Sequence, residues 1–97
     1  MKLYIVEWDG YSLMSIHYTK ESAEEHYSGH FLEDIREVDV IGEIVDNKVY
    51  AVVDGTMHWI GICASEYQAS HVCYKCKDDN YYVEMMDVMG EWVDESK

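Results

Sequence analysis

Cysteine and histidine side chains gather most tightly between His71 and Cys76. Cys73 and Cys76 form a C-x-x-C pair, and His71 precedes that pair by two residues. Thiolates and imidazoles are the ligands of tetrahedral zinc sites, and Cys63, on the strand expected before this segment, would complete a set of three cysteines and one histidine. Redox chemistry and burial as small hydrophobic side chains are the alternatives, because residues three apart share one face of a helix.

No second C-x-x-C motif accompanies this cluster. We therefore expect buried cysteines and no cofactor, and we keep a zinc- or ligand-binding domain at Cys63, His71, Cys73 and Cys76 as the alternative function. His26 and His30 also have a spacing that can bind a metal on a helix, but the glutamate of the H-E-x-x-H motif is missing between them.

The sequence contains none of the common short catalytic motifs. It lacks G-x-S-x-G, the phosphate-binding G-x-x-x-x-G-K-[ST] and G-x-G-x-x-G. Its serines, histidines and acids are dispersed, so no nucleophile and base can be paired from spacing alone. We expect a protein that is not an enzyme.

Acidic residues dominate the composition. Twenty Asp and Glu against seven Lys and Arg give a formal net charge of −13. Counterion release from nucleic acid requires clustered Lys and Arg, so direct nucleic-acid binding is not expected, nor is binding to an anionic membrane. The complementary partner is a basic protein surface, which electrostatic steering would help to find.

Seven carboxylates are the candidates for that acidic surface, and they follow one another along the first half of the chain. They are Glu21, Glu24, Glu25, Glu33, Asp34, Glu37 and Asp39. Their array could imitate the regularly spaced charges of DNA phosphates, about one per 1.7 Å of duplex. An ordinary solvated face is the alternative.

Aromatic side chains are unusually frequent, with nine tyrosines and three tryptophans. Tyr11, Tyr67 and Trp92 are candidates for a binding surface, because Tyr and Trp often anchor protein interfaces. The alternative is that they pack within the sheet, between the two halves of the chain or in a homodimer.

An internal repeat organises these candidates. The string Asp39-Val40-Ile41-Gly42-Glu43-Ile44-Val45-Asp46 returns as Asp87-Val88-Met89-Gly90-Glu91-Trp92-Val93-Asp94, with six identical positions of eight. Upstream, residues 13–19 align with residues 59–65 at an offset of 46, whereas the closing strings are 48 apart. Such drift is typical of insertions in loops.

Local patterns predict the same elements in each half. The first half reads as strands over Lys2–Trp8 and Leu13–Tyr18, a helix capped by Thr19 that runs to Tyr27, and a strand over Arg36–Val45. A tight Asp46-Asn47 turn starts the second half. This half reads as strands over Val49–Val53 and Met57–Ala64, a helix over Glu66–Cys76 capped by Ser65, and a strand over Tyr81–Val93.

The expected fold is α+β: tandem duplicated ββαβ units with six mostly antiparallel strands, two helices and pseudo-two-fold symmetry. The units span residues 1–46 and 47–94 of one compact domain, followed by an acidic tail at 94–97. Each half alone is near the lower size limit for a stable core, so the halves should share a core, a sheet or a dimer interface. An acidic N-terminal segment without a signal-peptide core, and no apolar run of about 20 residues, predict a cytoplasmic protein.

The strand, turn, strand and Thr-Lys-Glu-Ser-Ala-Glu-Glu run from Tyr4 to Tyr27, with its second pass from Tyr50 to Cys73, resembles the small ββαβ proteins of phages and mobile elements. The acidic, tyrosine-rich and proline-free chain is also similar to phage proteins that disable host defence enzymes, including anti-CRISPR and DNA-mimic inhibitors. This resemblance implies a binding protein that acts in the host cytoplasm by occupying a basic nucleic-acid-binding surface. A structural oligomerisation module is a further alternative.

Overall fold

The protein combines six strands with two helices, so the predicted α+β class is confirmed. The structure, a computed structural model, describes residues 1–9, 12–27, 29, 32–75 and 80–90, with the backbone alone at residue 75. The elements in chain order are β1 (Lys2–Trp8), β2 (Ser12–His17), α1 (Lys20–His26), β3 (Glu33–Asp39), β4 (Lys48–Val53), β5 (Trp59–Cys63), α2 (Glu66–Lys75) and β6 (Tyr82–Met89).

The six strands form one mixed sheet in the order β3-β1-β2-β6-β4-β5. β1 pairs antiparallel with β2 and β3, and β4 pairs antiparallel with β5 and β6. β6 then runs alongside β2 in the same direction, where Ile16 pairs with Val88 and His17 with Met89. The expectation of a mostly antiparallel sheet is therefore corrected to a mixed sheet, because the strand that joins the two halves does so in parallel.

Within each half, the first strand lies in the middle: β1 pairs with β3 on one side and β2 on the other, and β4 pairs with β6 on one side and β5 on the other. The register of β1 and β2 shifts so that Met14 is an extra residue, and the register of β4 and β5 shifts in the same way at Ile60. A single extra residue of this kind is a β-bulge, which increases the local twist of the strands. Both bulges contribute to the curl of the sheet.

β3 is shorter than predicted, because it ends at Asp39 and does not continue to Val45. The physical reason is the length of its partner: Asp39 already pairs with Lys2, and the amide of Val40 donates to the Met1 carbonyl at 2.7 Å. β1 itself begins at Lys2, so the ladder between the two strands ends at the pair of Lys2 with Asp39. Gly42 at φ 105° then turns the chain away from the sheet.

The other boundaries differ from prediction by a few residues. β2 begins and ends one residue earlier than expected. β5 begins at Trp59, because Met57 has a φ of 62°, which an extended strand does not allow. β6 ends at Met89, and residues 91–93 of the predicted strand lie outside the described residues. The predicted Thr19 cap is confirmed, with its side chain accepting from the Ser22 amide at 3.1 Å.

The predicted Asp46-Asn47 turn is also confirmed. Both residues have positive φ angles of 55° and 57°, as expected for the tight hairpin turn whose twist matches that of the flanking strands. The turn leads directly into β4, and Val45 and Lys48 form an isolated bridge across it. The two halves are therefore joined by a hairpin.

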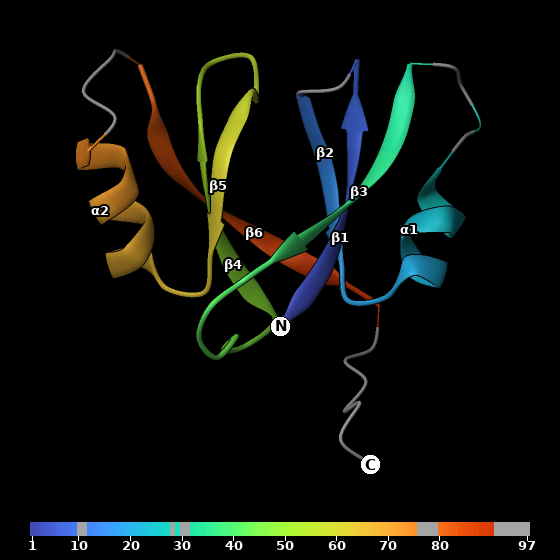
Figure 1. Ribbon diagram of the computed structural model, residues 1–97, viewed down its shortest axis with the longest axis horizontal. Coiled ribbons are helices and arrows are strands. Elements are labelled where there is room, and N and C mark those ends of the chain that lie inside the picture. Colours follow the sequence, from blue (N-terminus) through green and yellow to red (C-terminus); the bar gives the residue numbers. More distant parts are fainter. Residues whose placement is uncertain (10–11, 28, 30–31, 76–79, 91–97) are drawn as a thin grey trace.

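Figure 1 shows α1 and α2 on opposite flanks of the molecule, with the strands between them and β6 crossing from one half to the other. The main core cluster contains side chains from both halves, which also share one sheet, and these are two of the arrangements that the sequence left open. Its members are Leu3, Ile5, Leu13, Ile16, Tyr18, Val40, Val49, Ala51, Val53, Ile62, Ala64 and Val88. In the part of the chain that the structure describes, no helix is long and apolar enough to cross a membrane.

Candidate functional site

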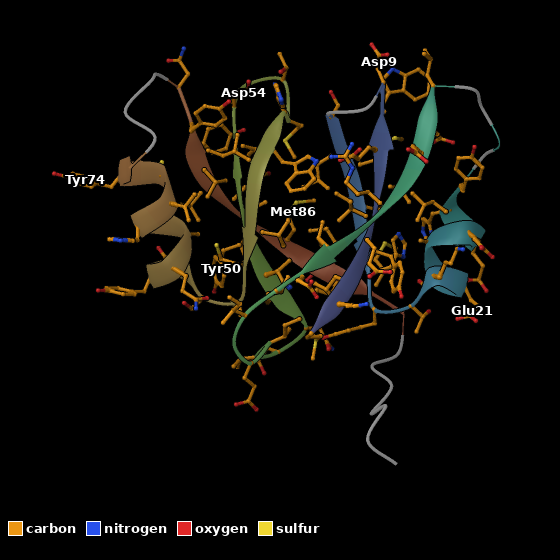
Figure 2. All side chains as sticks on the ribbon, viewed as in Figure 1. Asp9, Glu21, Tyr50, Asp54, Tyr74 and Met86 are labelled. Atoms are coloured by element: carbon orange, nitrogen blue, oxygen red, sulfur yellow. The ribbon has the colours of Figure 1, made fainter. Side chains whose placement is uncertain are left out.

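The sequence-predicted carboxylates lie on α1 and β3. Glu21, Glu24 and Glu25 of α1 are exposed, as are Asp34, Glu37 and Asp39 of β3. Glu33 differs from them, because its side chain is buried with 8% exposure. Figure 2 shows Glu21 extending away from α1 at the outer flank of the molecule.

Pairing with cations separates the α1 carboxylates from other acids. Lys2 pairs with Glu37 at 3.0 Å, and Lys48 pairs with Asp87. Among the residues that the structure describes, Glu21, Glu24 and Glu25 are in contact with no cation. The outer face of α1 therefore carries three carboxylates that are not neutralised within the described part of the chain.

Of the predicted interface aromatics, Tyr67 is 83% exposed on α2. Tyr74 lies further along the same helix at 74% exposure and extends outward in Figure 2. Tyr11 and Trp92 lie outside the described residues. A tyrosine that is almost fully exposed has an apolar ring available to a partner.

The four predicted metal ligands are not all brought together by the described structure. Cys63 and His71 line one groove, whereas Cys73 Sγ donates to the carbonyl of Tyr81 at 3.2 Å. Cys76 lies outside the described residues. No group of three or more metal-ligating side chains was found among the described ones. The zinc site remains a sequence-based prediction.

The groove beside Cys63 is formed by α2, β5 and the segment that follows β3. Its apolar lining comes from Ile41, Ile62, Cys63, Tyr67 and Val72. Asp39, Gln68 and His71 add polar atoms. Its volume of about 380 Å³ falls within the range of small binding pockets.

Local packing explains why these elements meet here. Ser65 Oγ accepts from the Gln68 amide at 3.2 Å, which fixes the start of α2 as expected for a helix cap. A Cβ on Gly42 would lie 3.3 Å from the Ala64 Cβ, and a Cβ on Gly61 would lie 3.6 Å from Val72 Cγ1. Gly42 therefore allows the segment after β3 to approach the start of α2 closely, whereas the contact at Gly61 is an ordinary one. Ile41, beside Gly42, is 82% exposed and lines the groove.

Burial raises the pKa of the Cys63 thiol. At neutral pH this residue is therefore a thiol, and the thiolate that nucleophilic attack requires is disfavoured. The groove has apolar surface and a few polar atoms at its edge, an arrangement that suits binding.

His17 is a buried polar residue that sequence reasoning did not single out. Its side chain is fully buried, with Nε2 2.7 Å from Ser15 Oγ and Nδ1 2.7 Å from Ser22 Oγ. Its ring centroid is 4.8 Å from that of His26. Burial, and then the neighbouring His26, lower the pKa of His17 to about 4, so its imidazole is neutral at pH 7. The signal in the sequence was its alignment with Cys63.

Glu7 is a second buried residue that was missed. It is fully buried, and Trp59 Nε1 donates a hydrogen bond to its Oε1. Its Oε2 lies 3.3 Å from Arg36 Nε in an ion pair without hydrogen-bond geometry. Because alternate residues of a strand share a face, the series Leu3, Ile5, Glu7 could have indicated that this carboxylate faces the core. The contact ties β1 of the first half to β5 of the second.

Comparisons of the chain with protein families, with curated protein sequences and with solved structures found no match.

Proposed function

We propose that this protein is a non-enzymatic acidic binding protein that occupies the basic nucleic-acid-binding surface of a host protein. The observation that carries the proposal is the outer face of α1. There Glu21, Glu24 and Glu25 are exposed and contact no cation among the described residues. The net charge of −13 adds a long-range field of the same sign.

A surface of this kind competes with nucleic acid by charge. Lys and Arg that normally contact phosphates would contact carboxylates, and the partner would be drawn in by electrostatic steering. Such binding weakens as salt screens the charges, over a Debye length of about 10 Å at 0.1 M. The phage anti-defence class, including anti-CRISPR and DNA-mimic inhibitors, is the version of this function that the resemblance of the chain favours.

We further propose that the chain arose by duplication of one ββαβ unit, with pseudo-two-fold symmetry between the copies. Equivalent hydrogen bonds in the two halves support this proposal. The amide of Val40 donates to the Met1 carbonyl at 2.7 Å, and the amide of Val88 donates to the Asn47 carbonyl at 2.8 Å. Met1 and Asn47 are 46 positions apart, the offset at which the halves align.

The two repeat glycines support the duplication as well. A Cβ on Gly42 would contact Ala64 and Gln68 at the start of α2, and a Cβ on Gly90 would contact Ser22 and Thr19 at the start of α1. Each half thus places its glycine against the helix of the other half. Both glycines have positive φ angles, 105° and 85°.

Salt-dependent capture tests the function. The immobilised protein is incubated with nuclease-treated bacterial lysate at about 50 mM salt, and bound proteins are eluted either with about 500 mM salt or with a DNA duplex. We expect a nucleic-acid-binding protein that both treatments release. A capture that yields no basic partner at low salt, or a partner that duplex DNA does not displace, would overturn the proposal.

Matched charge removal then locates the contact on α1. The variant E24Q/E25Q removes two charges from the helix, and E43Q/E66Q removes two exposed charges elsewhere. We expect the first to weaken binding of the captured partner about tenfold and the second to have a much smaller effect. Equal weakening by the two variants would show that only the net charge matters.

A further inference from the structure

The groove between α2, β5 and the segment after β3 is not explained by charge competition alone. Its two most exposed apolar residues, Ile41 at 82% and Tyr67 at 83% exposure, stand at its edge. Cys63 and Val72, which are half-buried, line the same groove, so its apolar lining includes both exposed and half-buried side chains. Exposed apolar surface next to a concave lining is typical of a site that receives another molecule.

The polar side of the groove indicates the charge of the occupant. Asp39 lines the groove, and its cross-strand partner is Lys2. Lys2, however, forms its ion pair with Glu37 at 3.0 Å. Lys2, Glu37 and Asp39 together carry a net charge of about −1, because one cation faces two carboxylates. Of the two carboxylates, Asp39 is the one that lines the groove.

Asp87, the aligned residue of the second half, provides the contrast. It pairs in register with Lys48, and their side chains form a direct ion pair. Asp87 therefore has a direct ion-pair partner within the protein, whereas Asp39 interacts with Lys2 only at longer range and retains the capacity to bind a second cation. Tyr67 stands on the same groove, and the face of an exposed tyrosine ring also attracts cations.

We infer that this groove binds a short segment of the basic partner protein in which an Arg or Lys side chain is flanked by apolar residues. The apolar side chains would pack against Ile41, Tyr67 and Val72, and the cation would contact Asp39. This inference rests on the proposed function, because it identifies a specific contact within the same acidic interface. The volume of about 380 Å³ has room for a few side chains and not for a folded element.

A second copy of the chain is the competing occupant. Its charge of −13 opposes self-association, because two such molecules repel each other at low salt. A cationic segment is instead attracted by the whole field of the protein. Charge complementarity therefore favours the basic segment.

The probe is the acetylated and amidated peptide Leu-Arg-Leu, titrated into the ¹⁵N-labelled protein at low salt. The matched peptide carries citrulline, which has nearly the shape of arginine without its charge. We expect shifts at the backbone amides of Ile41, Tyr67 and Val72, with the arginine peptide binding about fivefold more tightly than the citrulline peptide. Shifts confined to α1, or equal binding of the two peptides, would overturn the inference.

Paired variants separate the two parts of the contact. D39N should weaken the arginine peptide about fivefold and leave the citrulline peptide unchanged, whereas D87N should change neither. Y67A should weaken both peptides, and Y74A, which removes an exposed tyrosine of the same helix outside the groove, should weaken neither. Equal effects of D39N and D87N would contradict a cation site at Asp39.

The remaining outcomes are also decisive. If the amides of Ile41 and Tyr67 shift with concentration in the protein alone, and light scattering gives twice the monomer mass, a second copy occupies the groove and the inference is wrong. If the arginine peptide does not bind, but a partner is still captured at low salt and E24Q/E25Q weakens its binding, only the assignment of the groove is withdrawn. If the capture fails while the peptide binds, the proposed function is withdrawn.

Discussion

The two regions where a helix packs against the sheet, around His17 next to α1 and around Cys63 next to α2, differ in the side chains that occupy them. In the region next to α1, His17 is enclosed by hydrogen bonds to Ser15 and Ser22, and the ring of His26 lies 4.8 Å from it. In the region next to α2, the residue aligned with His17 is Cys63, which lines an open groove of about 380 Å³. The aligned positions thus hold a fully buried, hydrogen-bonded histidine in the first half and a groove-lining cysteine in the second.

The outer surfaces of the two helices differ in the same sense. Glu21 of α1 aligns with Tyr67 of α2, and Glu25 aligns with His71. Three exposed glutamates thus mark the helix above His17, and two exposed tyrosines mark the helix above Cys63. Under the two proposals above, α1 would make an electrostatic contact with the partner, and the groove beside α2 would receive apolar side chains of the same partner.

The largest expected difference between the two regions is in their response to pH. His17 binds a proton with a pKa of about 4 when folded and near 6.5 when unfolded, so the unfolded state binds more protons between these values. Stability should therefore fall as the pH drops from 6.5 to 4, by at most about 3 kcal/mol from this residue.

Urea unfolding of the wild type and of H17C across this pH range measures that difference. The variant places in the first region the residue type of the second, and we expect it to lose this part of the pH dependence. His26, the titratable neighbour of His17, remains present in both proteins. An unchanged pH slope in H17C would show that other groups dominate.

The two repeat glycines should tolerate a methyl group unequally. A Cβ on Gly90 would lie 2.8 Å from Ser22 Oγ and 2.9 Å from Ser22 Cβ, whereas a Cβ on Gly42 would lie 3.3 Å from the Ala64 Cβ. Both positions also have positive φ. We expect G90A to cost about 2 to 3 kcal/mol and G42A about 1 kcal/mol, measured by thermal or urea unfolding. The reverse order would contradict the tighter packing at α1.

The two halves also differ at one core position. When Lys2 of β1 is aligned with Lys48 of β4 by their strand pairing, Glu7 of β1 corresponds to Val53 of β4. E7V copies the second half into the first, and it leaves the indole N–H of Trp59 without its acceptor. We expect a loss of about 2 kcal/mol. The double variant E7V/W59F removes the donor as well and should cost less than the sum of the single variants. Additive losses would show that the two side chains are not coupled.

The smallest expected effect concerns the aligned aspartates. D87N removes the ion pair with Lys48 and should cost about 0.5 kcal/mol, as is usual for exposed pairs. D39N removes a carboxylate that has no direct ion pair within the described residues and should change stability even less. Equal losses at low salt would indicate that Lys2 supports Asp39 as strongly as Lys48 supports Asp87.

Local signals predicted most of the elements of this chain. The strand over Lys2–Trp8, the Thr19 cap and the Asp46-Asn47 turn depend on neighbours in sequence, and all three are confirmed. The predicted extent of Arg36–Val45 was wrong, because the end of a strand depends on how far its partner reaches. That information lies at Met1 and Lys2, far away in the sequence.

The candidate site shows the same division. Composition indicated an acidic surface, and the exposed carboxylates of α1 were among the residues named for it. The burial of Glu33 and of His17 could not be read from residue type, and the partner of Glu7 could not be identified because Trp59 lies 52 residues away in the sequence. The groove was also missed, since it is formed by three separate segments.

By itself, the sequence determined the order of the elements, the α+β class and the acidic character of the protein, because these follow from periodicity, capping residues and charge. Tertiary structure decided that β6 runs parallel to β2, that Trp59 meets Glu7 across the halves, and that Cys63 lies in a groove with Ile41 and Tyr67. The physical reason is that pairing and packing select among segments far apart in the chain, and no local pattern specifies that selection.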